Sequence, residues 1–419
     1  MQLIETAPES EACDSADWTN ETIESLVDAP VRYGVVQVGE DTHDGVPIVA
    51  IKFVKEIDHA PLHRTSRKLE EPYAGSRVSP GDVLISIKGT IGRVGVVPKG
   101  FFGNISRELA RIRVKETVCP EYIAYQLESG ATQRRIFNSV VGTTRLEFSI
   151  ATLRKFEIPV PPTLDEQRAI AGALSDVDAL LGVLDRMLTK KRDLKQAAMQ
   201  QLLTGQTRLP GFKGKWEEHE VQDVIERYFC GPSPTCEERN IQGDEEWGVL
   251  KTTASTKTNG WDWTKHKTLP RVFWNKPHLE LTEGDLIVTK AGPRHRVGVA
   301  ACVDFVPPRI IVSGKMIGLR PNRSKVVPAM LAAAISQPKA QRYLDQRTTG
   351  MAEAQVNFEN VALMETTIEL PLLDEQAAIA EVLSDMDAEI AALERRREKT
   401  QDLKQGMMQE LLTGKTRLV

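Results

Sequence analysis

The sequence contains one long segment twice. The stretch DEQRAIAGALSDVDALLGVLD, which begins at Asp165, returns as DEQAAIAEVLSDMDAEIAALE at Asp374, and both copies run on to a Leu-Leu-Thr-Gly motif. The offset is 209 residues (374 − 165) and holds without a gap. An internal duplication of this length constrains the fold more than any single motif does.

Both copies have the periodicity of a long amphipathic helix, with apolar residues at steps of three and four. A helix with so narrow an apolar stripe buries it best against a similar helix. We predict that the copies pair as an antiparallel coiled coil related by a pseudo-twofold axis, with a parallel pair as the other possible arrangement. The predicted seam consists of Ile170, Leu174, Val177, Leu181 and Leu184 in the first copy and Ile379, Leu383, Met386, Ile390 and Leu393 in the second. After a shift, we expect it to continue through Leu194, Ala198 and Leu202 and through Leu403, Met407 and Leu411.

The TGKT stretch near the end of the second copy looks like part of a phosphate-binding loop, but we interpret it as a helix end. Gln409 occupies the position where such a loop requires a glycine, and Gln206 replaces the lysine in the first copy. Gly205 and Gly414 are instead typical of the residue that follows a helix. At the start of the first helix, Thr163–Glu166 predicts a capping box.

A weaker repeat precedes each helix. Gly81–Ser86 matches Gly284–Thr289, and Arg93–Val96 matches Arg296–Val299, both at an offset of 203 (284 − 81). A turn, an apolar strand, a basic loop with glycine and a second strand therefore recur in order, while the residues around them differ. The pattern indicates two mixed α/β modules on one scaffold that recognise two different things.

The formal net charge of −4 conceals two basic stretches. Residues 1–46 carry one basic and 11 acidic residues, residues 47–160 carry 18 basic and 11 acidic residues, and residues 251–347 carry 17 basic and 6 acidic residues. Separate positive patches are typical of proteins that bind a polyanion, although solvated charged surfaces give similar counts.

No motif for catalysis, metal binding or export is present. His59 and His63 flank Pro61 and cannot share a helix face, which argues against a zinc site. The first 20 residues lack Lys and Arg, no apolar run approaches the roughly 18 residues of a membrane helix, and the five cysteines form no C-x-x-C pair. We expect a cytoplasmic protein with reduced thiols, no metal, no catalytic residues and no membrane contact.

Taken together, the motifs resemble the specificity subunits of type I restriction–modification systems. The resemblance covers nearly the whole chain. It rests on two P-x-x-x-E-Q helix starts (162–167 and 371–376), two LLTG helix ends, Gly-Thr-Thr at 142–144, Leu-Pro-Gly-Phe at 209–212 with Trp216, and Gly-Pro-Ser-Pro at 231–234. The second half lacks the double proline and has Gly350-Met351-Ala352 in place of Gly-Thr-Thr. A role of those threonines is therefore expected in the first module only.

The resemblance implies a non-catalytic subunit in which two α/β target-recognition domains each read half of a split site in double-stranded DNA. The antiparallel helices would act as a ruler and hold two methyltransferase subunits, which restriction and translocase subunits would join. S-adenosylmethionine, ATP and magnesium would belong to those partners. The implied parts are an acidic leader (1–20), a first target-recognition domain (21–160), a central helix (161–207), a second target-recognition domain (208–370) and a C-terminal helix (371–419).

DNA contacts are expected from Lys and Arg on phosphates and from forked or amide side chains on base edges, both placed on loops. The loops Lys88–Arg93 and Lys290–Arg296 follow matching strands and are the strongest candidates, although Arg93 and Arg296 fit a purely turn-forming role as well. The predicted contacts in the first module are Lys52, Arg64, Arg67, Lys68, Lys88, Arg93, Thr143, Thr144 and Arg145. Those in the second module are Lys251, Thr252, Lys257, Lys265, Lys267, Lys290, Arg294, His295 and Arg296.

Several alternatives stay open. Trp261 and Trp263 suit either stacking on DNA or, more commonly, packing within a small domain. The acidic pairs Glu70-Glu71 and Asp176/Asp178 are interpreted as solvated or subunit-facing charges. The chief alternative function is a coiled-coil scaffold or adaptor whose basic modules bind a protein or another polyanion. A stand-alone DNA-modifying enzyme and an orphan subunit without partners are further possibilities.

Overall fold

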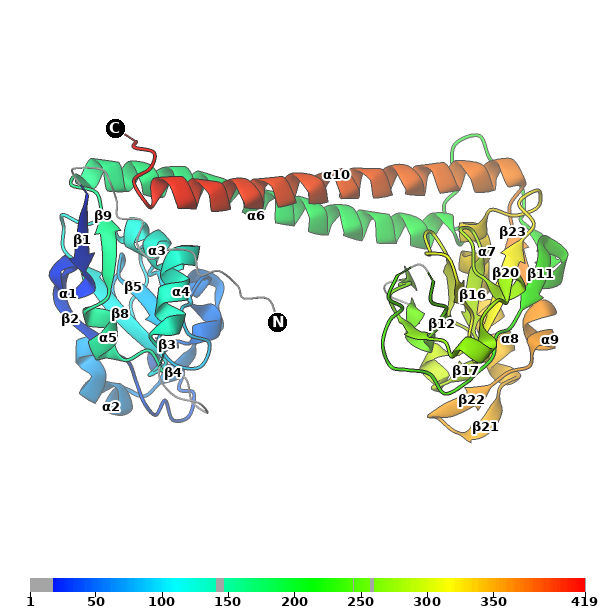
Figure 1. Cartoon of the computed structure of the whole chain (residues 1–419), viewed down its shortest axis with the longest axis horizontal. Coiled ribbons are helices and arrows are strands. Elements are labelled where there is room, and N and C mark those ends of the chain that lie inside the picture. The colour runs from blue at the N-terminus through cyan, green and yellow to red at the C-terminus, as the bar shows by residue number, and fades with distance from the viewer. Residues whose placement is uncertain (1–17, 141–146, 244, 257–259, 419) are drawn as a thin grey trace. The chain divides into compact units, whose positions relative to one another are not determined.

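The computed structural model describes residues 18–140, 147–243, 245–256 and 260–418. The chain divides into two compact units: unit 1 joins Met1–Arg186 with Glu394–Val419, and unit 2 is Met187–Leu393. Each unit holds one mixed α/β domain and about half of each of two long helices (Figure 1). These helices are α6 (Leu164–Leu202) and α10 (Leu373–Leu411).

The central sheet of unit 1 has four antiparallel strands in the order β2-β8-β5-β6. Every residue of β5 is buried, and successive side chains serve two different cores. Val83 and Ile85 belong to the larger core with Tyr122, whereas Leu84 belongs to a smaller core with Val49. Burial on both faces explains why this strand is apolar without alternation. The four strands are β2 (Val27–Tyr33), β5 (Val83–Ser86), β6 (Val94–Val96) and β8 (Leu109–Val114).

A second sheet of unit 1 has three strands, in which β3 pairs antiparallel with β4 and parallel with β7. A separate antiparallel pair, β1 with β9, leads into α6. The elements of unit 1 outside the central sheet are β1 (Thr19–Thr22), α1 (Ile23–Leu26), β3 (Val46–Val49), η1 (Ile51–Phe53), η2 (Ile57–His59), β4 (His63–Thr65), α2 (Arg67–Glu70), η3 (Glu71–Ser76), β7 (Asn104–Ile105), α3 (Pro120–Glu128), α4 (Gly130–Asn138), α5 (Ile150–Arg154) and β9 (Glu157–Val160).

Unit 2 repeats this strand order. Its four-stranded sheet is β11-β20-β16-β18, its three-stranded sheet β15-β12-β19 keeps one parallel pair, and β10 pairs with β23. Leu286 and Val288 of β16 face one core and Ile287 faces another, as in β5. The strands of these sheets are β10 (Glu217–Glu220), β11 (Ile225–Phe229), β12 (Gly248–Leu250), β15 (His266–Thr268), β16 (Leu286–Thr289), β18 (Ala300–Cys302), β19 (Ile310–Ile311), β20 (Met316–Pro321) and β23 (Thr367–Leu370).

Unit 2 also contains elements outside these sheets, including a β13-β14 pair and a β17-β22-β21 sheet. They are η4 (Val221–Val224), η5 (Thr252–Ala254), β13 (Ser255–Thr256), β14 (Gly260–Trp261), η6 (Arg271–Phe273), η7 (Pro277–Leu279), β17 (Ala291–Gly292), η8 (Arg294–Arg296), α7 (Pro328–Ile335), α8 (Pro338–Gln346), β21 (Thr349–Ala352), β22 (Gln355–Asn357) and α9 (Asn360–Met364).

The long helices end where the sequence predicts. Gly205 and Gly414 follow α6 and α10 with φ of 68° and 73°, the left-handed conformation that favours glycine after a helix. The predicted capping box at the start of α6 is only half formed. Thr163 Oγ1 accepts a hydrogen bond from the Glu166 N–H at 3.2 Å, but the Glu166 carboxylate binds Arg417 instead of the cap backbone.

The predicted continuation of the apolar seam is wrong at Leu194 and Leu403 and confirmed at its later positions, where Leu202 and Leu411 are buried and Ala198 and Met407 are half-buried. Leu194 and Leu403 are 47% and 56% exposed. The inward positions continue at unbroken steps of three and four, through Lys191 and Lys195 in α6 and through Arg397, Thr400 and Lys404 in α10. Long cationic side chains can fill such positions because their aliphatic stems cover apolar surface while the charged heads reach acidic partners. Of the other seam residues, Ile170, Leu174, Leu181, Leu184, Ile379, Leu383 and Ile390 are buried, and Val177, Met386 and Leu393 are half-buried.

Within unit 1, the helix segments run in opposite directions. Asp185 pairs with Arg397 at 2.5 Å and Asp178 pairs with Lys404 at 2.7 Å, so positions rise in one helix as they fall in the other. The acidic residue Asp178, expected to be solvated or subunit-facing, therefore lies in this helix contact and also accepts a hydrogen bond from Tyr125 at 2.9 Å.

Within unit 2, the helix segments also run in opposite directions. Lys191 pairs with Glu389, and Lys195 pairs with Asp387. Both pairs place an α6 lysine beside an α10 carboxylate. The aliphatic part of each lysine can therefore lie in the helix contact while its ammonium group is neutralised.

Candidate nucleic-acid interface

In unit 1, the loop after β5 is closed at its base by Ser86. Ser86 Oγ donates to the Thr90 carbonyl (2.5 Å) and accepts from the Arg93 N–H (2.8 Å). The Lys88 ammonium lies 3.3 Å from the Glu147 carboxylate, and the Arg93 side chain is exposed. A Cβ on Gly89 would lie 3.7 Å from Ile51, so the loop also lies close to η1, the turn that carries Lys52.

The other predicted cations of unit 1 lie on neighbouring short elements. Lys52 is exposed, with its ammonium 4.4 Å from the centre of the Phe53 ring. Arg64, on β4, donates to the Gly45 carbonyl at 3.2 Å. Arg67 and Lys68 are exposed on α2. Thr143, Thr144 and Arg145, and also Lys257 of the second module, lie outside the described residues.

In unit 2, the loop after β16 contains the short helix η8. Arg294 forms ion pairs with Asp345 (2.5 Å) and Glu353 (3.2 Å), and the hydrogen bond that it donates to Asp345 raises the pKa of its guanidinium. Arg296 donates to the Thr252 carbonyl at 3.4 Å, which brings two predicted contact residues together. His295 is exposed between the two arginines.

The predicted equivalence of the two loops is wrong by three residues at its distal end. Ser86 N–H donates to the Arg93 carbonyl, and at the same place in unit 2 Thr289 N–H donates to the Val299 carbonyl. Arg93 therefore corresponds to Val299, and Arg296 lies in an insertion that unit 1 lacks. The identical RVGV strings at 93–96 and 296–299 do not occupy equivalent positions, because the register is set by strand pairing instead of by local sequence.

The start of the loop also differs from the prediction. The Phe148 N–H donates to the Ile87 carbonyl, and the Phe358 N–H donates to the Lys290 carbonyl. Lys290 thus occupies the place of the buried Ile87, not of Lys88. It is half-buried, and its ammonium donates to Asn360 Oδ1 at 3.0 Å.

Three predicted lysines of unit 2 have acidic partners. Lys251 and Lys267 both pair with Glu238, the former at 3.3 Å, and hydrogen bonds from these two lysines, chiefly Lys267, lower the pKa of the Glu238 carboxyl. Lys265 lies 3.7 Å from Asp262. The positive charge counted in this stretch of sequence is therefore partly neutralised in the folded unit.

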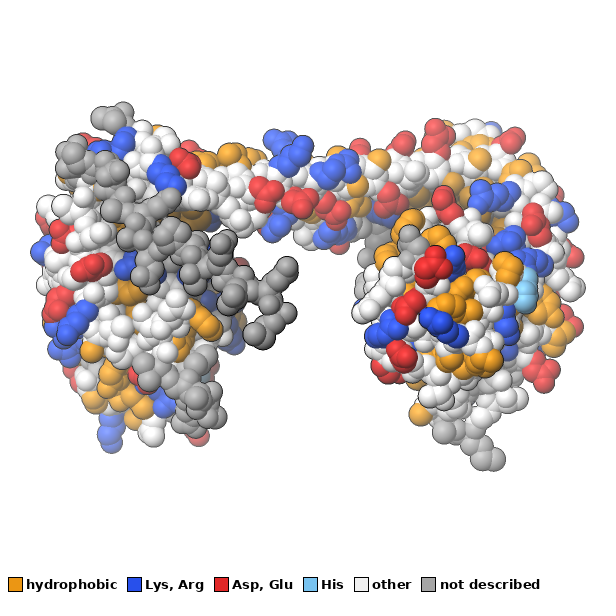
Figure 2. Space-filling model, in the orientation of Figure 1, with side chains coloured by type: hydrophobic (Ala, Val, Ile, Leu, Met, Phe, Trp, Pro, Cys, Tyr) orange, Lys and Arg blue, Asp and Glu red, His pale blue; other side chains and the backbone are white. Residues whose placement is uncertain are grey.

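The two tryptophans of unit 2 take part in packing. Trp261 Nε1 donates to the Phe305 carbonyl at 2.8 Å. Trp263 stacks on His266 with ring centres 6.0 Å apart and meets the Phe305 ring edge-on. Packing is the interpretation that these contacts favour. Figure 2 shows basic and acidic side chains interspersed with hydrophobic areas on the visible face of each unit.

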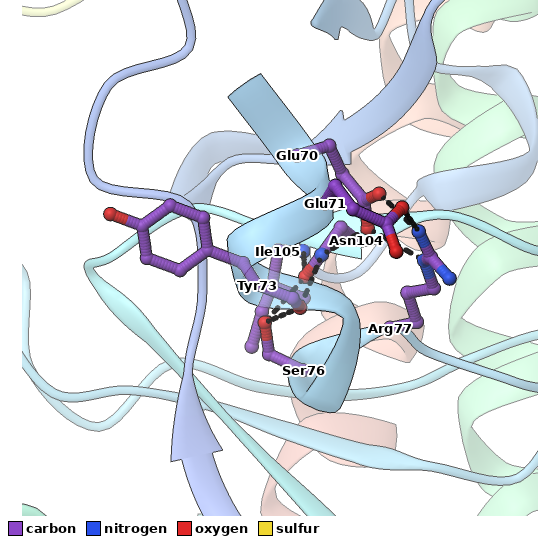
Figure 3. A network of polar contacts seen from close by, with 7 residues as sticks. All are labelled: Glu70, Glu71, Tyr73, Ser76, Arg77, Asn104 and Ile105. Carbon is purple, nitrogen blue, oxygen red and sulfur yellow. Dashed lines mark hydrogen bonds and ion pairs between the residues drawn. The ribbon is translucent and has the colours of Figure 1, made fainter. Parts of the chain in front are cut away.

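The interpretation of Glu70 as a solvated charge is wrong (Figure 3). Its side chain is fully buried and accepts two hydrogen bonds from Arg77, at 2.7 and 2.8 Å, and one from Asn104 at 2.7 Å. Burial raises the pKa of this carboxyl, but the bonds from Arg77 and Asn104 outweigh it, and the net pKa is lowered. Glu71 pairs with the same arginine from the surface.

An ion pair that recurs beside the central sheet of each unit was missed. Asp82 accepts two hydrogen bonds from Arg113 (2.8 and 2.7 Å), and Asp285 accepts two from Arg320 at the same distances. The aspartates belong to the repeated dipeptides Gly81-Asp82 and Gly284-Asp285, and this repeat was the sequence signal that could have revealed the ion pair. Their arginine partners lie on the neighbouring strands of the sheets, β8 and β20, at an offset of 207 (320 − 113) that the sequence comparison did not align.

The described residues contain no group of three or more His, Cys, Asp or Glu side chains arranged to hold a metal ion. In the same part of the chain, no helix combines the length and apolar character that crossing a bilayer requires. The four described cysteines, Cys119, Cys230, Cys236 and Cys302, are free thiols.

Sequence comparison relates both halves of the chain to one family. The profile described as "Type I restriction modification DNA specificity domain" matches residues 18–186 and 213–402. The putative type I restriction enzyme MjaX specificity subunit of Methanocaldococcus jannaschii is 26% identical over 434 aligned positions, covering 96% of this chain and 94% of that protein. The type I restriction enzyme EcoEI specificity subunit of Escherichia coli is 29% identical over 170 residues, covering 41% of this chain and 28% of that protein.

Solved structures share the fold over nearly the whole chain. The crystal structure of a type I restriction-modification S subunit from M. genitalium aligns with a TM-score of 0.54 at 16% identity, covering 97% of this chain and 99% of that one. The HsdS subunit from Thermoanaerobacter tengcongensis aligns with a TM-score of 0.50 at 17% identity, covering 96% and 98%. At these identities the likeness concerns the fold alone.

Proposed function

Because the chain belongs to the type I restriction-modification DNA specificity family, we propose that it is the DNA-recognition subunit of such a complex and that each of its two modules reads one half of a split DNA site. The subunit itself is non-catalytic, and methylation and cleavage belong to other subunits. The modules are the target-recognition domains 21–160 and 208–370, joined by the helical spacers 161–207 and 371–419. The first domain also takes in residues 18–20, which were expected in the leader, because Trp18 packs in the core of unit 1 and β1 begins at Thr19.

The observation that carries the proposal is that the two units share the strand order of their sheets but differ in the loops between the strands. The two units have the same strand order in three sheets, yet the loops after β5 and β16 differ in length, charge and partners. A protein that recognises one symmetric target twice needs no such difference. Two frames with different reading loops suit a target whose halves differ in sequence.

We further propose that α6 and α10 form an antiparallel coiled coil with a pseudo-twofold axis, which sets the gap between the half-sites. Reciprocal ion pairs support this: Asp178 with Lys404 returns as Asp387 with Lys195, each residue displaced by 209. Reciprocity of this kind, in which i contacts j and the copy of j contacts the copy of i, is what a twofold relation requires.

The proposed partners follow from the same family. Two methyltransferase subunits would dock on the helical spacers, and restriction and translocase subunits would join that core. S-adenosylmethionine, ATP and magnesium would be bound by those partners, and the complex would act on double-stranded DNA in the cytoplasm. The loop cations, Lys52, Arg67, Lys68 and Arg93 in particular, are the proposed phosphate and base contacts of the first module.

Selection of bound duplexes from a random library, with the chain in complex with its methyltransferase subunit, tests the proposal. We expect a motif of two short defined parts separated by a fixed stretch of any sequence, with affinity that falls steeply as salt rises. An adaptor that binds a polyanion without reading it would show the salt dependence but no motif. That result, or a single uninterrupted motif, would contradict the proposal.

A further inference from the structure

A glutamine of unit 1 holds the base of the loop that follows β5. Gln133 lies on α4, and its Nε2 donates to the carbonyls of Gly92 at 2.9 Å and Leu127 at 2.5 Å. Leu127 belongs to the last turn of α3, whose carbonyls lack partners within the helix. One side chain therefore ties a helix end to the glycine at which the loop returns to the sheet.

Unit 2 has the same arrangement. Gln341, on α8, donates from Nε2 to the carbonyls of Gly298 and Ile335, both at 2.8 Å. Ile335 is the last residue of α7, just as Leu127 lies at the end of α3. The contact is therefore duplicated in donor, acceptors and surrounding elements, although the loop sequences differ.

The glycine is fixed from its other side as well. The Gly92 N–H donates to the Ser86 carbonyl at 2.9 Å, and the Gly298 N–H donates to the Thr289 carbonyl at 2.8 Å. Both glycines have positive φ, 86° and 80°, and a Cβ would lie 2.3 Å from Gln133 Oε1 or 3.0 Å from Gln341 Oε1. Glycine and glutamine at these positions thus depend on each other.

Between these fixed ends the two loops have little in common. Ile87–Ile91 is closed by the Ser86 hydroxyl, which bonds within its own loop. Lys290–Val297 is three residues longer, contains η8, and is tied to α8 and the β21-β22 hairpin through Arg294. The base is kept constant while the exposed part varies, which is the arrangement that allows a reading loop to change its target without losing its position.

We propose that Gln133 and Gln341 are positioning residues for DNA recognition, each fixing the base of the loop that reads the half-site of its own unit. The inference rests on the proposed function, because it takes the loops 87–91 and 290–297 to be reading elements. The glutamines themselves need not touch DNA. Their effect is to hold loop side chains such as Lys88 in one orientation relative to the sheet, so that DNA binding does not bear the entropic cost of ordering the loop.

The test uses the complex of the full chain with its methyltransferase subunit. Gln133→Met keeps the length of the side chain and removes both donors, Gln133→Lys returns donors on a chain of similar length, and Gln341→Met is the matched variant in unit 2. For each complex, affinity is measured for the selected duplex and for duplexes with single base changes in either half-site, together with the melting temperature.

Gln133→Met is expected to lower base discrimination about tenfold in one half-site and to leave the other half-site unchanged, with Gln133→Lys restoring most of it. Gln341→Met is expected to do the same in the opposite half-site. Unchanged discrimination in both half-sites, or an equal loss in both that follows the melting temperature, would overturn the inference. A wild-type complex that selects no split motif would instead overturn the proposed function on which the inference stands.

Discussion

Arg417 binds the start of a helix that begins some 250 residues earlier in the chain: its Nη2 lies 2.8 Å from the Oε2 of Glu166. Glu166 is only 5% exposed, and the Arg417 guanidinium also lies 6.0 Å from the centre of the Trp18 ring. In unit 2, Arg208 makes the matching contact with Glu375 and lies 5.9 Å from the centre of the Trp216 ring. The first turn of each long helix thus binds an arginine from the segment that follows the other long helix.

Replacing Arg417 by alanine should destabilise unit 1. The Glu166 carboxylate would remain buried without its charged partner, a change that typically costs about 2–4 kcal/mol. Denaturant unfolding of the variant measures this loss, and Arg208→Ala should give a similar loss in unit 2. The exposed Lys399 on α10 supplies the control, since its replacement by alanine should change stability by less than about 0.5 kcal/mol. Equal stability of the Arg417 variant and the wild type would show that this contact does not hold the helix start.

The lowered pKa of Glu70 predicts an acid-sensitive contribution in unit 1. Because the folded-state pKa is below that of the unfolded chain, the stabilisation is complete above about pH 4.5 and is lost as pH falls through the folded-state value. Glu70→Gln should therefore lower the unfolding free energy at pH 7 by about 1–3 kcal/mol, and the difference from the wild type should shrink toward pH 3.

Glu71→Gln is the matched control for that experiment. Glu71 pairs with the same arginine but is 70% exposed at its side chain, so its removal should cost less than about 1 kcal/mol. Two variants with the same loss at pH 7, or a Glu70→Gln difference that is constant from pH 7 to pH 3, would mean that the buried carboxylate contributes nothing through its charge.

Glu238 should restrain DNA binding by unit 2. It neutralises Lys251 and Lys267, both of which the sequence predicts to be DNA contacts. Glu238→Gln should raise the affinity of the complex for all duplexes and steepen the salt dependence by up to about two counterions, one for each lysine released. Binding isotherms at several salt concentrations provide the measurement. If the logarithm of the affinity falls with the logarithm of the salt concentration at the same slope in variant and wild type, these lysines lie away from the DNA.

Two leucine substitutions compare the predicted and the observed helix contact. Leu174→Ala removes a fully buried side chain and should cost about 2–5 kcal/mol. Leu194→Ala removes one that is 47% exposed and should cost less than about 1 kcal/mol. The unfolding free energies of the two variants, measured from denaturant curves, decide between the predicted and the observed contact. A large loss from Leu194→Ala would restore the shifted seam that the sequence predicts.

This contrast shows what the sequence could and could not predict. The helix ends followed from Gly205 and Gly414, because a local conformational requirement leaves a local signature. The seam after Leu184 followed only in part: hydrophobicity identifies Ala198 and Leu202 but passes over Lys191 and Lys195, whose stems pack while their ammonium groups pair with acids on the other helix. Only the pairing of segments far apart in the chain reveals those partners.

The candidate interface was predictable to the same degree. The strands flanking each loop were recognised from repeated apolar and glycine positions, whereas the loop register was not. Hydrogen bonds across β5 and β6, and across β16 and β18, make Arg93 the counterpart of Val299, information that no short motif carries. The burial of Glu70 was equally hidden, since Arg77 and Asn104 meet it only in the folded unit.

Insertion of four helix-forming residues at the end of α6, ahead of Gly205, tests the central claim most directly. Four helical residues add about 6 Å, close to the rise of two base pairs of DNA. Selection of bound duplexes by the complex carrying this insertion should give the same two half-site sequences with a changed gap between them. An unchanged gap, or new half-site letters, would contradict the account of two reading modules held apart by a helical spacer.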